Sequence, residues 1–275
     1  MSANLELKRV SEWGELRGFS NLFHKENLSW WSTRKWWINA LIWPIMLCGL
    51  AANMLFVPTI ISLGSPEEIA LAGGETAYVI LTGLSVFFEF GTMAVALGAI
   101  VLCQDLVLEE KTNGVLEWLL SKPVARRAYL LSKLLVNLIY CILFLILIPA
   151  VITYGLFFLR LGSPFPVLPF LSGVGIMILH MTFYIALTML LGVFFSSRAP
   201  VLGISLGLVL GGNLLAGLIK PLLYVSPWIL AKTASLVAGS QPVPVELIWP
   251  PIISTALWTI IFIAVSLVKF EQAEF

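Results

Sequence analysis

The sequence predicts an all-α polytopic membrane protein, and two observations lead to this fold class. Hydrophobic residues make up 59% of the 275 residues, charged residues make up 11%, and the mean hydropathy is +0.98. Soluble domains contain roughly a quarter charged residues, so this chain has too little polar surface to cover a water-soluble core. The apolar residues also gather in runs of about 20 residues or more, the length of a helix that crosses the bilayer hydrocarbon.

Six apolar runs reach that length. They cover residues 38–61, 78–103, 129–159, 167–195, 201–219 and 247–268. No polar stretch between them is long enough to fold separately, so we expect a single membrane domain over residues 1–275. Within it, a cytoplasmic or interfacial segment is expected at residues 1–37, the six-span domain at 38–268 and a cytoplasmic tail at 269–275.

Basic residues are distributed unevenly between the two sets of loops. With the N-terminus inside, 13 of the 16 Lys and Arg residues fall on the cytoplasmic side, and Arg160, Lys220 and Lys232 fall outside. Cytoplasmic loops of membrane proteins carry an excess of Lys and Arg. The sequence therefore predicts a multi-pass protein of the cell membrane, plasma or inner, with both termini in the cytoplasm.

The segment before the first span has an amphipathic pattern. Five apolar residues recur every three positions with charges between them, namely Val10, Trp13, Leu16, Phe19 and Leu22. This spacing favours a helix that lies in the membrane surface, and the alternative is a solvated helix packed on the loops.

The loop at residues 104–128 has the most specific content. Its acidic residues, Glu109 among them, are expected to continue the second span out of the bilayer until residues 112–114 break the helix. A short helix is then expected at residues 115–121, ended by Pro123. It carries Leu116 and Trp118 among five apolar residues with a charged rim, a composition typical of a docking surface. The alternative is a helix that lies back on the bilayer or on its neighbours.

Residues 109–135, EEKTNGVLEWLLSKPVARRAYLLSKLL, resemble the signature of type-2 ABC exporter permeases. In that family acidic residues end the second span, and a Leu-Glu-x-Leu-Leu-Ser segment, Pro-Val, a basic pair and a lysine that opens the third span follow. Glu109, the segment 116–121, Pro123, the pair 126–127 and Lys133 hold these positions here. The C-terminal FEQAEF is similar to the short charged tail of the family.

This resemblance implies a permease subunit of an ATP-driven exporter. Such a permease pairs with a second permease, the same or a related chain, and each contacts a cytoplasmic ATP-binding cassette subunit. Loop 104–128 would hold a coupling helix, and ATP-driven closure of the ATPases would open a path outward. The ATPase-coupling residues implied are Glu109, Glu110, Leu116, Glu117, Trp118, Leu119, Leu120, Pro123, Arg126 and Arg127.

No enzyme chemistry is expected from this chain. The phosphate-binding pattern Gly-x-x-x-x-Gly-Lys-Ser/Thr is absent from the sequence, so ATP and Mg²⁺ would be bound by the partner subunit. We expect no catalytic residue, no metal and no cofactor on the chain itself. Cys48, Cys103 and Cys141 lie in or beside apolar runs and match no metal-site spacing. A net charge of +1 gives no reason to expect nucleic acid as a partner.

Polar residues inside the spans are candidates for a translocation path. Glu89 lies near the middle of the second span with Ser85 four residues before it, and His180 lies in the middle of the fourth. An ionised carboxylate there costs roughly 2.5 kcal/mol or more, so Glu89 should face protein or water. Glu89 either lines the export path or binds a cationic group, or it is a protonated carboxyl bonded to a neighbouring helix. His180 is more typical of a packing residue.

Glycines repeat every four residues in the fifth span, at Gly203, Gly207 and Gly211. Such a stripe allows close helix contact, either at a dimer seam or within one subunit. Between the fifth and sixth spans, residues 220–246 are interrupted by four prolines, which favours short re-entrant or surface helices.

Three other functions stay open. A non-transporting membrane anchor driven by an ABC ATPase would share every coupling feature. An ion-coupled secondary transporter finds support in Glu89 alone, because no repeated halves are evident. A membrane enzyme would need clustered catalytic residues, and the two histidines are isolated in the sequence. The few charges in the spans do not favour an ionic substrate, and a hydrophobic or amphiphilic one is what the family resemblance implies.

Overall fold

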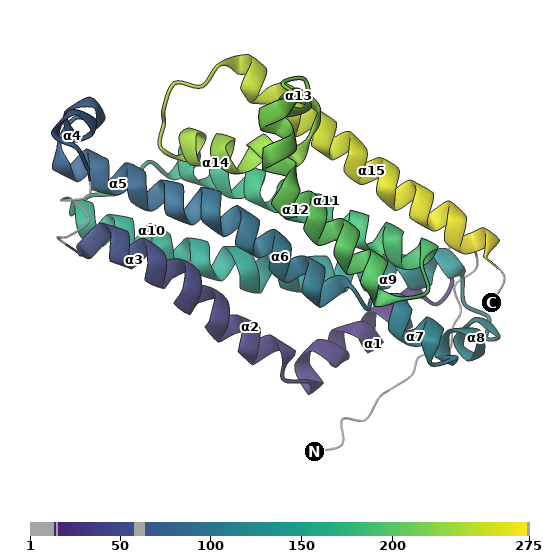
Figure 1. The fold of residues 1–275 in the computed structure, drawn as a ribbon. Coiled ribbons are helices and arrows are strands. Elements are labelled where there is room, and N and C mark those ends of the chain that lie inside the picture. The colour runs from purple at the N-terminus through teal and green to yellow at the C-terminus, as the bar shows by residue number, and fades with distance from the viewer. Residues whose placement is uncertain (1–13, 15, 58–63, 274–275) are drawn as a thin grey trace.

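In the computed structural model, residues 14, 16–57 and 64–273 are described, and they form helices without strands. Long helices run side by side in a single bundle (Figure 1). Five stretches of these residues are long and apolar enough to cross a membrane: Lys35–Phe56, Glu75–Thr112, Arg126–Leu161, Val167–Phe194 and Val245–Gln272. The predicted fold class, an all-α polytopic membrane protein, is confirmed.

The first three of these stretches are built from several helical segments each. The first contains α2 (Lys35–Trp43), a π-helical turn η1 (Pro44–Cys48) and α3 (Gly49–Phe56). The second contains α5 (Glu75–Ser85), the π-helical turn η3 (Val86–Phe90) and α6 (Gly91–Cys103). The third contains α9 (Arg126–Cys141), η4 (Ile142–Leu147) and α10 (Ile148–Leu161). Turns of this kind are rare and often lie at functional positions. The turn η3 carries Glu89, one of the predicted path residues.

The remaining long helices are α11 (Val167–Phe194), α12 (Arg198–Leu218) and α15 (Trp249–Gln272). Helix α12 corresponds to the expected fifth span and runs for 21 residues. Within α12, the apolar helical part is Arg198–Gly212, which is shorter than each of the five stretches above. A sixth membrane crossing therefore stays a prediction.

The N-terminal helix differs in position from the expected one. Helix α1 (Phe19–Ser32) begins near the end of the apolar pattern and continues as far as the tryptophans. Val10 and Trp13, on which the surface helix was predicted, lie outside the described residues. Trp30 is buried because it stacks on Tyr140 of α9, so α1 is packed on the bundle over its C-terminal half.

Short helices fill the connections. Helix α4 (Pro66–Ala72) begins with a capping box between Ser65 and Glu68. The predicted short helices of residues 220–246 are present as α13 (Leu222–Val225), η5 (Pro227–Ile229), α14 (Leu230–Ala238) and η6 (Val245–Leu247). Helix α14 packs against α5, η3 and α11, and Leu230, Ala234 and Ala238 are fully buried in that contact.

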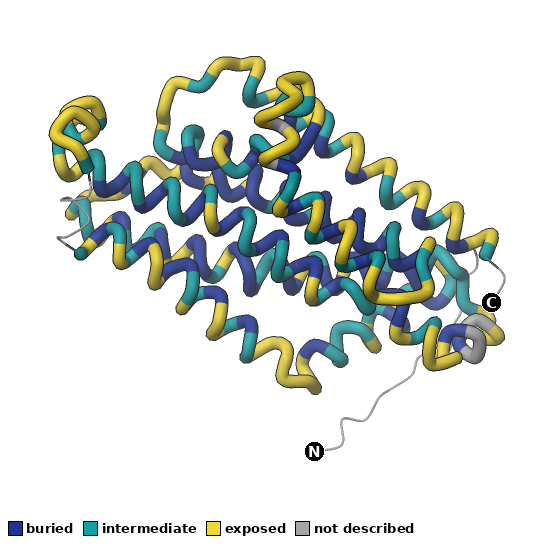
Figure 2. The backbone as a smooth tube through the Cα atoms, in the orientation of Figure 1, coloured by how far each residue is buried: buried dark blue, intermediate teal, exposed yellow. Residues whose placement is uncertain are grey.

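The two ends of the bundle differ in character. Helices α1, α7 (Leu108–Thr112) and α8 (Val115–Leu120) gather with the C-terminal end of α15 at one end, which we call the charged end (Figure 1). Helix α4 lies at the opposite end. Between the ends, the outer helices expose many residues (Figure 2), including the large apolar side chains of Leu168, Leu214 and Ile260. In a membrane protein, lipid or a second subunit covers such surfaces.

Candidate functional site

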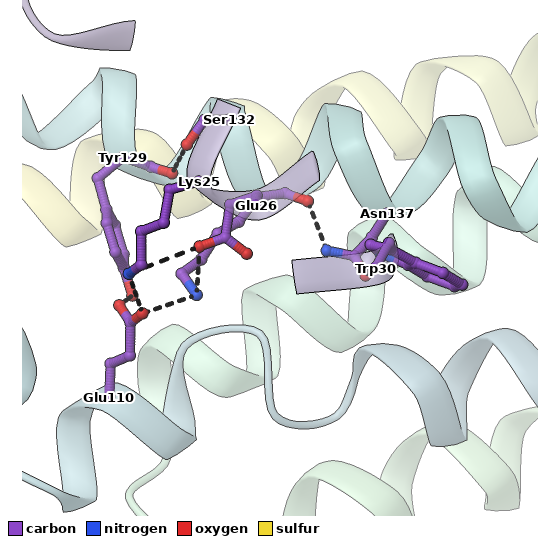
Figure 3. Close-up of polar contacts among 8 residues, drawn as sticks. Lys25, Glu26, Trp30, Glu110, Tyr129, Ser132 and Asn137 are labelled. Atoms are coloured by element: carbon purple, nitrogen blue, oxygen red, sulfur yellow. Dashed lines mark hydrogen bonds and ion pairs between the residues drawn. The ribbon is translucent and has the colours of Figure 1, made fainter. Parts of the chain in front are cut away.

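Four charged side chains from three helices meet at the charged end (Figure 3). They are Lys25 and Glu26 of α1, Glu110 of α7 and Lys133 of α9, and we call them the ion cluster. Lys25 Nζ lies 2.8 Å from Glu110 Oε1, and Lys133 Nζ lies 3.3 Å from an oxygen of both Glu26 and Glu110. The cluster therefore links α1, α7 and α9 by direct ion pairs.

Most of the ion cluster is shielded from solvent. The side chains of Lys133, Glu26 and Glu110 are 9%, 13% and 15% exposed, whereas Lys25 is 48% exposed. Two carboxylates and two ammonium groups balance in charge. Buried charges are tolerated when they are paired, and removal of one partner leaves the other stranded at a high cost. The three helices are therefore expected to stay together when any one of them is displaced.

Neutral hydrogen-bonding groups surround the ion cluster (Figure 3). The Tyr129 hydroxyl donates to Glu110 Oε2 at 2.6 Å. Trp30 Nε1 donates to Asn137 Oδ1 at 3.1 Å, and Asn137 Nδ2 donates to the Lys133 carbonyl at 2.8 Å. The Trp30–Asn137 bond thus fastens α1 to the middle of α9, and the Tyr129–Glu110 bond fastens α7 to the first turn of α9.

The end of α15 is attached to the start of α9. Arg127 forms a bidentate pair with Glu271, with Nε 2.6 Å from Oε1 and Nη2 donating to Oε2 at 2.9 Å. Arg126 Nη1 donates to the carbonyl oxygens of Glu271 at 2.8 Å and Ala273 at 2.5 Å. The Phe270 ring stacks on Tyr129, with centroids 5.4 Å apart. The predicted basic pair 126–127 thus binds the C-terminal helix.

The short helix of the loop has the predicted position, and two of its leucines fit the alternative in which the helix lies on its neighbours. Gly114 takes a positive φ of 67° between α7 and α8, as the expected helix break requires. Leu116 and Leu119 are 1% and 8% exposed and belong to the hydrophobic core. These two leucines therefore do not contribute to an exposed docking patch, because they face the bundle.

The other residues of the loop that the resemblance implied for coupling differ in their surroundings. Glu109 and Pro123 are exposed at the charged end, whereas Glu110 is in the ion cluster. The side chains of Glu117, Trp118 and Leu120 lie outside what the structure describes. Their predicted contact with an ATPase stays a prediction.

A second set of contacts joins residues 105–111, at the C-terminal end of the second long stretch, to the connection between α11 and α12. Arg198 Nε lies 2.6 Å from Asp105 Oδ1, and Lys111 Nζ donates to the Phe195 carbonyl at 3.4 Å. Sequence reasoning placed Lys25, Glu26 and Glu271 on the same side of the membrane as the loop but did not identify their ion pairs. Their partners lie far away in sequence, and no local spacing indicates them.

The predicted path residues lie in the membrane-spanning part. Ser85 Oγ donates to Glu89 Oε1 at 3.1 Å. Glu89 and His180 line one cavity of about 260 Å³, together with Lys232 from the start of α14. The sequence indicated no acid near His180, and the fold brings Glu89 there. Ser85 does not line this cavity, and its link to the cavity is the hydrogen bond to Glu89. In the described part of the chain, no group of three or more His, Cys, Asp or Glu residues could hold a metal ion.

The glycine stripe of α12 has open space in front of it in the described part of the subunit. A Cβ atom at Gly203, Gly207 or Gly211 would meet no heavy atom of the described chain within 4 Å. The alternative that the stripe packs within one subunit therefore does not match the structure, and the dimer seam stays a prediction. Gly212 is different, because the Trp228 indole packs directly on it.

The fold and this site define a multi-pass helical membrane protein whose loop and terminal helices are joined at one end. A family model described as an ABC-2 family transporter protein matches residues 20–275. The chain therefore belongs to the ABC-2 transporter family, as the motif at residues 109–135 predicted. No curated protein matches the sequence.

Proposed function

We propose that this chain is the permease subunit of an ATP-driven ABC exporter in the plasma or inner membrane. A separate cytoplasmic ATPase subunit binds ATP and Mg²⁺, and a second permease, the same or a related chain, completes the transporter. The charged end and both termini face the cytoplasm. The observation that carries the proposal is the ion cluster, because it connects the α7–α8 loop directly to α1 and α9.

The contacts at the charged end support a route for mechanical coupling. A force on α8 acts on α7 through Gly114, and α7 holds Glu110. Separation of Glu110 from Lys133 would strand buried charges, so the force is passed to α9 rather than breaking the contact. Tyr129 and Arg127 connect the same part of α9 to α15. Motion of the loop thus reaches two long helices of the bundle.

The burial of Leu116 and Leu119 gives α8 a fixed position on the bundle. A helix held in this way transmits displacement better than a free loop, because its inner face is packed like a protein interior. Val115, at the edge of the packed face, and the neighbouring Glu109 are exposed and are left for the ATPase. We propose that Trp118 is the main apolar contact there, since buried aromatic anchors dominate binding energy at interfaces.

Affinity purification of the chain from its native membranes, with mass spectrometry of the proteins that co-purify, tests the proposal. Near-stoichiometric recovery of an ATP-binding cassette protein is expected. Trp118→Ala is expected to reduce that recovery about tenfold or more, as loss of a central aromatic anchor does. Trp249→Ala is the matched control, because Trp249 is an exposed tryptophan at the first residue of α15, and Glu271 at the far end of that helix pairs with Arg127.

Two results would contradict the proposal. One is recovery of the chain alone in detergents mild enough to preserve complexes. The other is equal recovery of the ATPase with Trp118→Ala and with Trp249→Ala, which would exclude α8 as the docking helix.

A further inference from the structure

A cavity of about 260 Å³ lies on the side of the bundle where α14 packs, away from the ion cluster. Its polar lining comes from four elements: Glu89 of η3, His180 and Tyr184 of α11, Trp228 of η5 and Lys232 of α14. Lys232 is exposed and His180 is 4% exposed. The cavity therefore runs from the surface at the start of α14 into the membrane-spanning part of the bundle.

The two charged groups of the cavity are not paired with each other. Among the described residues, Glu89 has the Ser85 hydroxyl as its hydrogen-bond partner and no cation within 4.0 Å. Lys232 likewise forms no ion pair with a described residue. A carboxylate within a spanning segment is expensive to keep ionised without a partner. A ligand that carries both a positive and a negative charge would form an ion pair with each of the two groups.

His180 gives a second and independent observation. Its side chain is more than nine-tenths buried, and Nδ1 has no hydrogen-bond partner among the described residues. Buried polar atoms nearly always have a partner, so an unpartnered one in the wall of a cavity indicates a missing ligand group. The Tyr184 ring lies 5.0 Å from the imidazole, which leaves the phenol beside the same space.

Size and charge narrow the class of ligand. The cavity is smaller than the roughly 300–1,000 Å³ that drug-sized ligands occupy, so a headgroup-sized molecule fits better. Lys232 would repel a simple cation, and Glu89 would repel a simple anion. A primary ammonium group offers three donors, enough for the Glu89 carboxylate and the His180 nitrogen together.

We propose that this cavity binds a zwitterion of the phosphoethanolamine type. The ammonium group lies at Glu89 and His180 in the inner part, and the phosphate lies at Lys232 at the surface. The same chemistry occurs in the headgroup of phosphatidylethanolamine and in free phosphoethanolamine. The site requires no ATPase, so it can be tested independently of the proposed function.

The test uses the purified full-length chain in phosphatidylcholine nanodiscs, and it follows the thermal unfolding midpoint by tryptophan fluorescence. Two probes are added separately: phosphatidylethanolamine in the nanodisc at increasing mole fraction, and soluble phosphoethanolamine. A ligand that binds the folded state raises the midpoint in a saturable way. Phosphatidylglycerol at the same mole fraction controls for a phosphate headgroup without an ammonium group.

The variants are Glu89→Gln and Lys232→Met, with Glu246→Gln and Lys220→Met as matched controls. Both control residues are exposed in the same connection between α12 and α15 and do not line the cavity. We expect the half-maximal concentration of the active probe to rise about tenfold in each cavity variant and to stay unchanged in the controls. Because Lys232 is exposed and unpaired in the described chain, Lys232→Met keeps the test valid if Glu89→Gln does not fold.

A response to phosphatidylethanolamine alone would assign the lipid headgroup as the ligand, and a response to both probes would assign a site open to free zwitterions. The proposal is overturned if neither probe shifts the midpoint. It is also overturned if phosphatidylglycerol acts equally well, or if the cavity variants respond like their controls.

Discussion

The Tyr129 hydroxyl donates a 2.6 Å hydrogen bond to the carboxylate of Glu110, and this bond joins the loop after the second span to the start of the third. The opposite side of the same residue is in contact with the last helix, because the Tyr129 ring stacks on Phe270 at an interplanar angle of 9°. Tyr129 is therefore a direct connection between α7 and α15. The Tyr129 hydroxyl makes the contact with α7 and the Tyr129 ring makes the contact with α15, so a substitution can remove one and keep the other.

Tyr129→Phe separates the two parts. The substitution keeps the ring on Phe270 and removes the bond to Glu110, which is expected to cost about 1.5–3 kcal/mol because the acceptor is charged. ATPase binding should be retained, whereas the rate of ATP-dependent transport should fall. Unfolding by denaturant and transport in proteoliposomes are the measurements. Phe270→Leu, which keeps the hydroxyl bond, is the complementary variant, and normal transport by Tyr129→Phe would rule out a role for the bond in coupling.

Two lysines that contact the same carboxylate should differ in their importance. Lys133 and Lys25 both pair with Glu110, but their side chains are 9% and 48% exposed. Lys133→Met is expected to destabilise the protein by about 3–5 kcal/mol, because it leaves two largely buried carboxylates with a single cation, the half-exposed Lys25. Lys25→Met is expected to cost about 0–1 kcal/mol, as exposed ion pairs do. Denaturant titration of the two variants in the same detergent measures the difference, and equal losses would show that burial does not determine the strength of the ion cluster.

Helix α12 depends on a close approach at Gly212. A methyl group there would overlap the Trp228 indole, so Gly212→Ala is expected to destabilise the protein by about 1–3 kcal/mol through overpacking. Gly217→Ala is the control on the same helix, since a Cβ atom at Gly217 would have no described neighbour within 4 Å. The thermal unfolding midpoint of each variant measures the effect. A drop of the same size in both would mean that the Trp228 contact is not the cause.

The glycine stripe of α12 leads to a prediction about assembly. If α12 meets a second permease along Gly203, Gly207 and Gly211, Gly207→Leu should weaken the association about tenfold without destabilising the single subunit. Cross-linking in native membranes, followed by sizing of the products, reports the association. Ala264→Leu on the exposed side of α15 adds the same bulk elsewhere. An unchanged yield of cross-linked dimer with Gly207→Leu would exclude the stripe as the seam.

Local sequence signals located most of the helices. The apolar runs placed the long helices within a few residues, and Asn113–Gly114 and Pro123 placed the break and the end of α8. These features depend on short-range chemistry, namely the length of a span, the freedom of glycine and the lost N–H of proline. The motif at residues 109–135 predicted the family for the same reason, because its residues are contiguous.

The site depended on contacts that no local pattern contains. Lys133 and Glu110 could be identified as charged and adjacent to spans, but Glu26 and Glu271 had no indication of their partners. The hydrophobic pattern of α8 could not distinguish Leu116, which is buried in the core, from a residue exposed for docking. Likewise, Glu89 and His180 lie on different spans, and only the packing of α14 against η3 and α11 encloses both in one cavity.

The sequence by itself thus determined membrane residence, the long helices, the loop that carries α8 and the family, because each follows from composition or from neighbouring residues. Tertiary structure alone decided which charges pair in the ion cluster, which face of α8 is buried and what surrounds Glu89. Those outcomes depend on how helices far apart in the chain pack, and the energy of a buried charge or leucine is set by its neighbours in space.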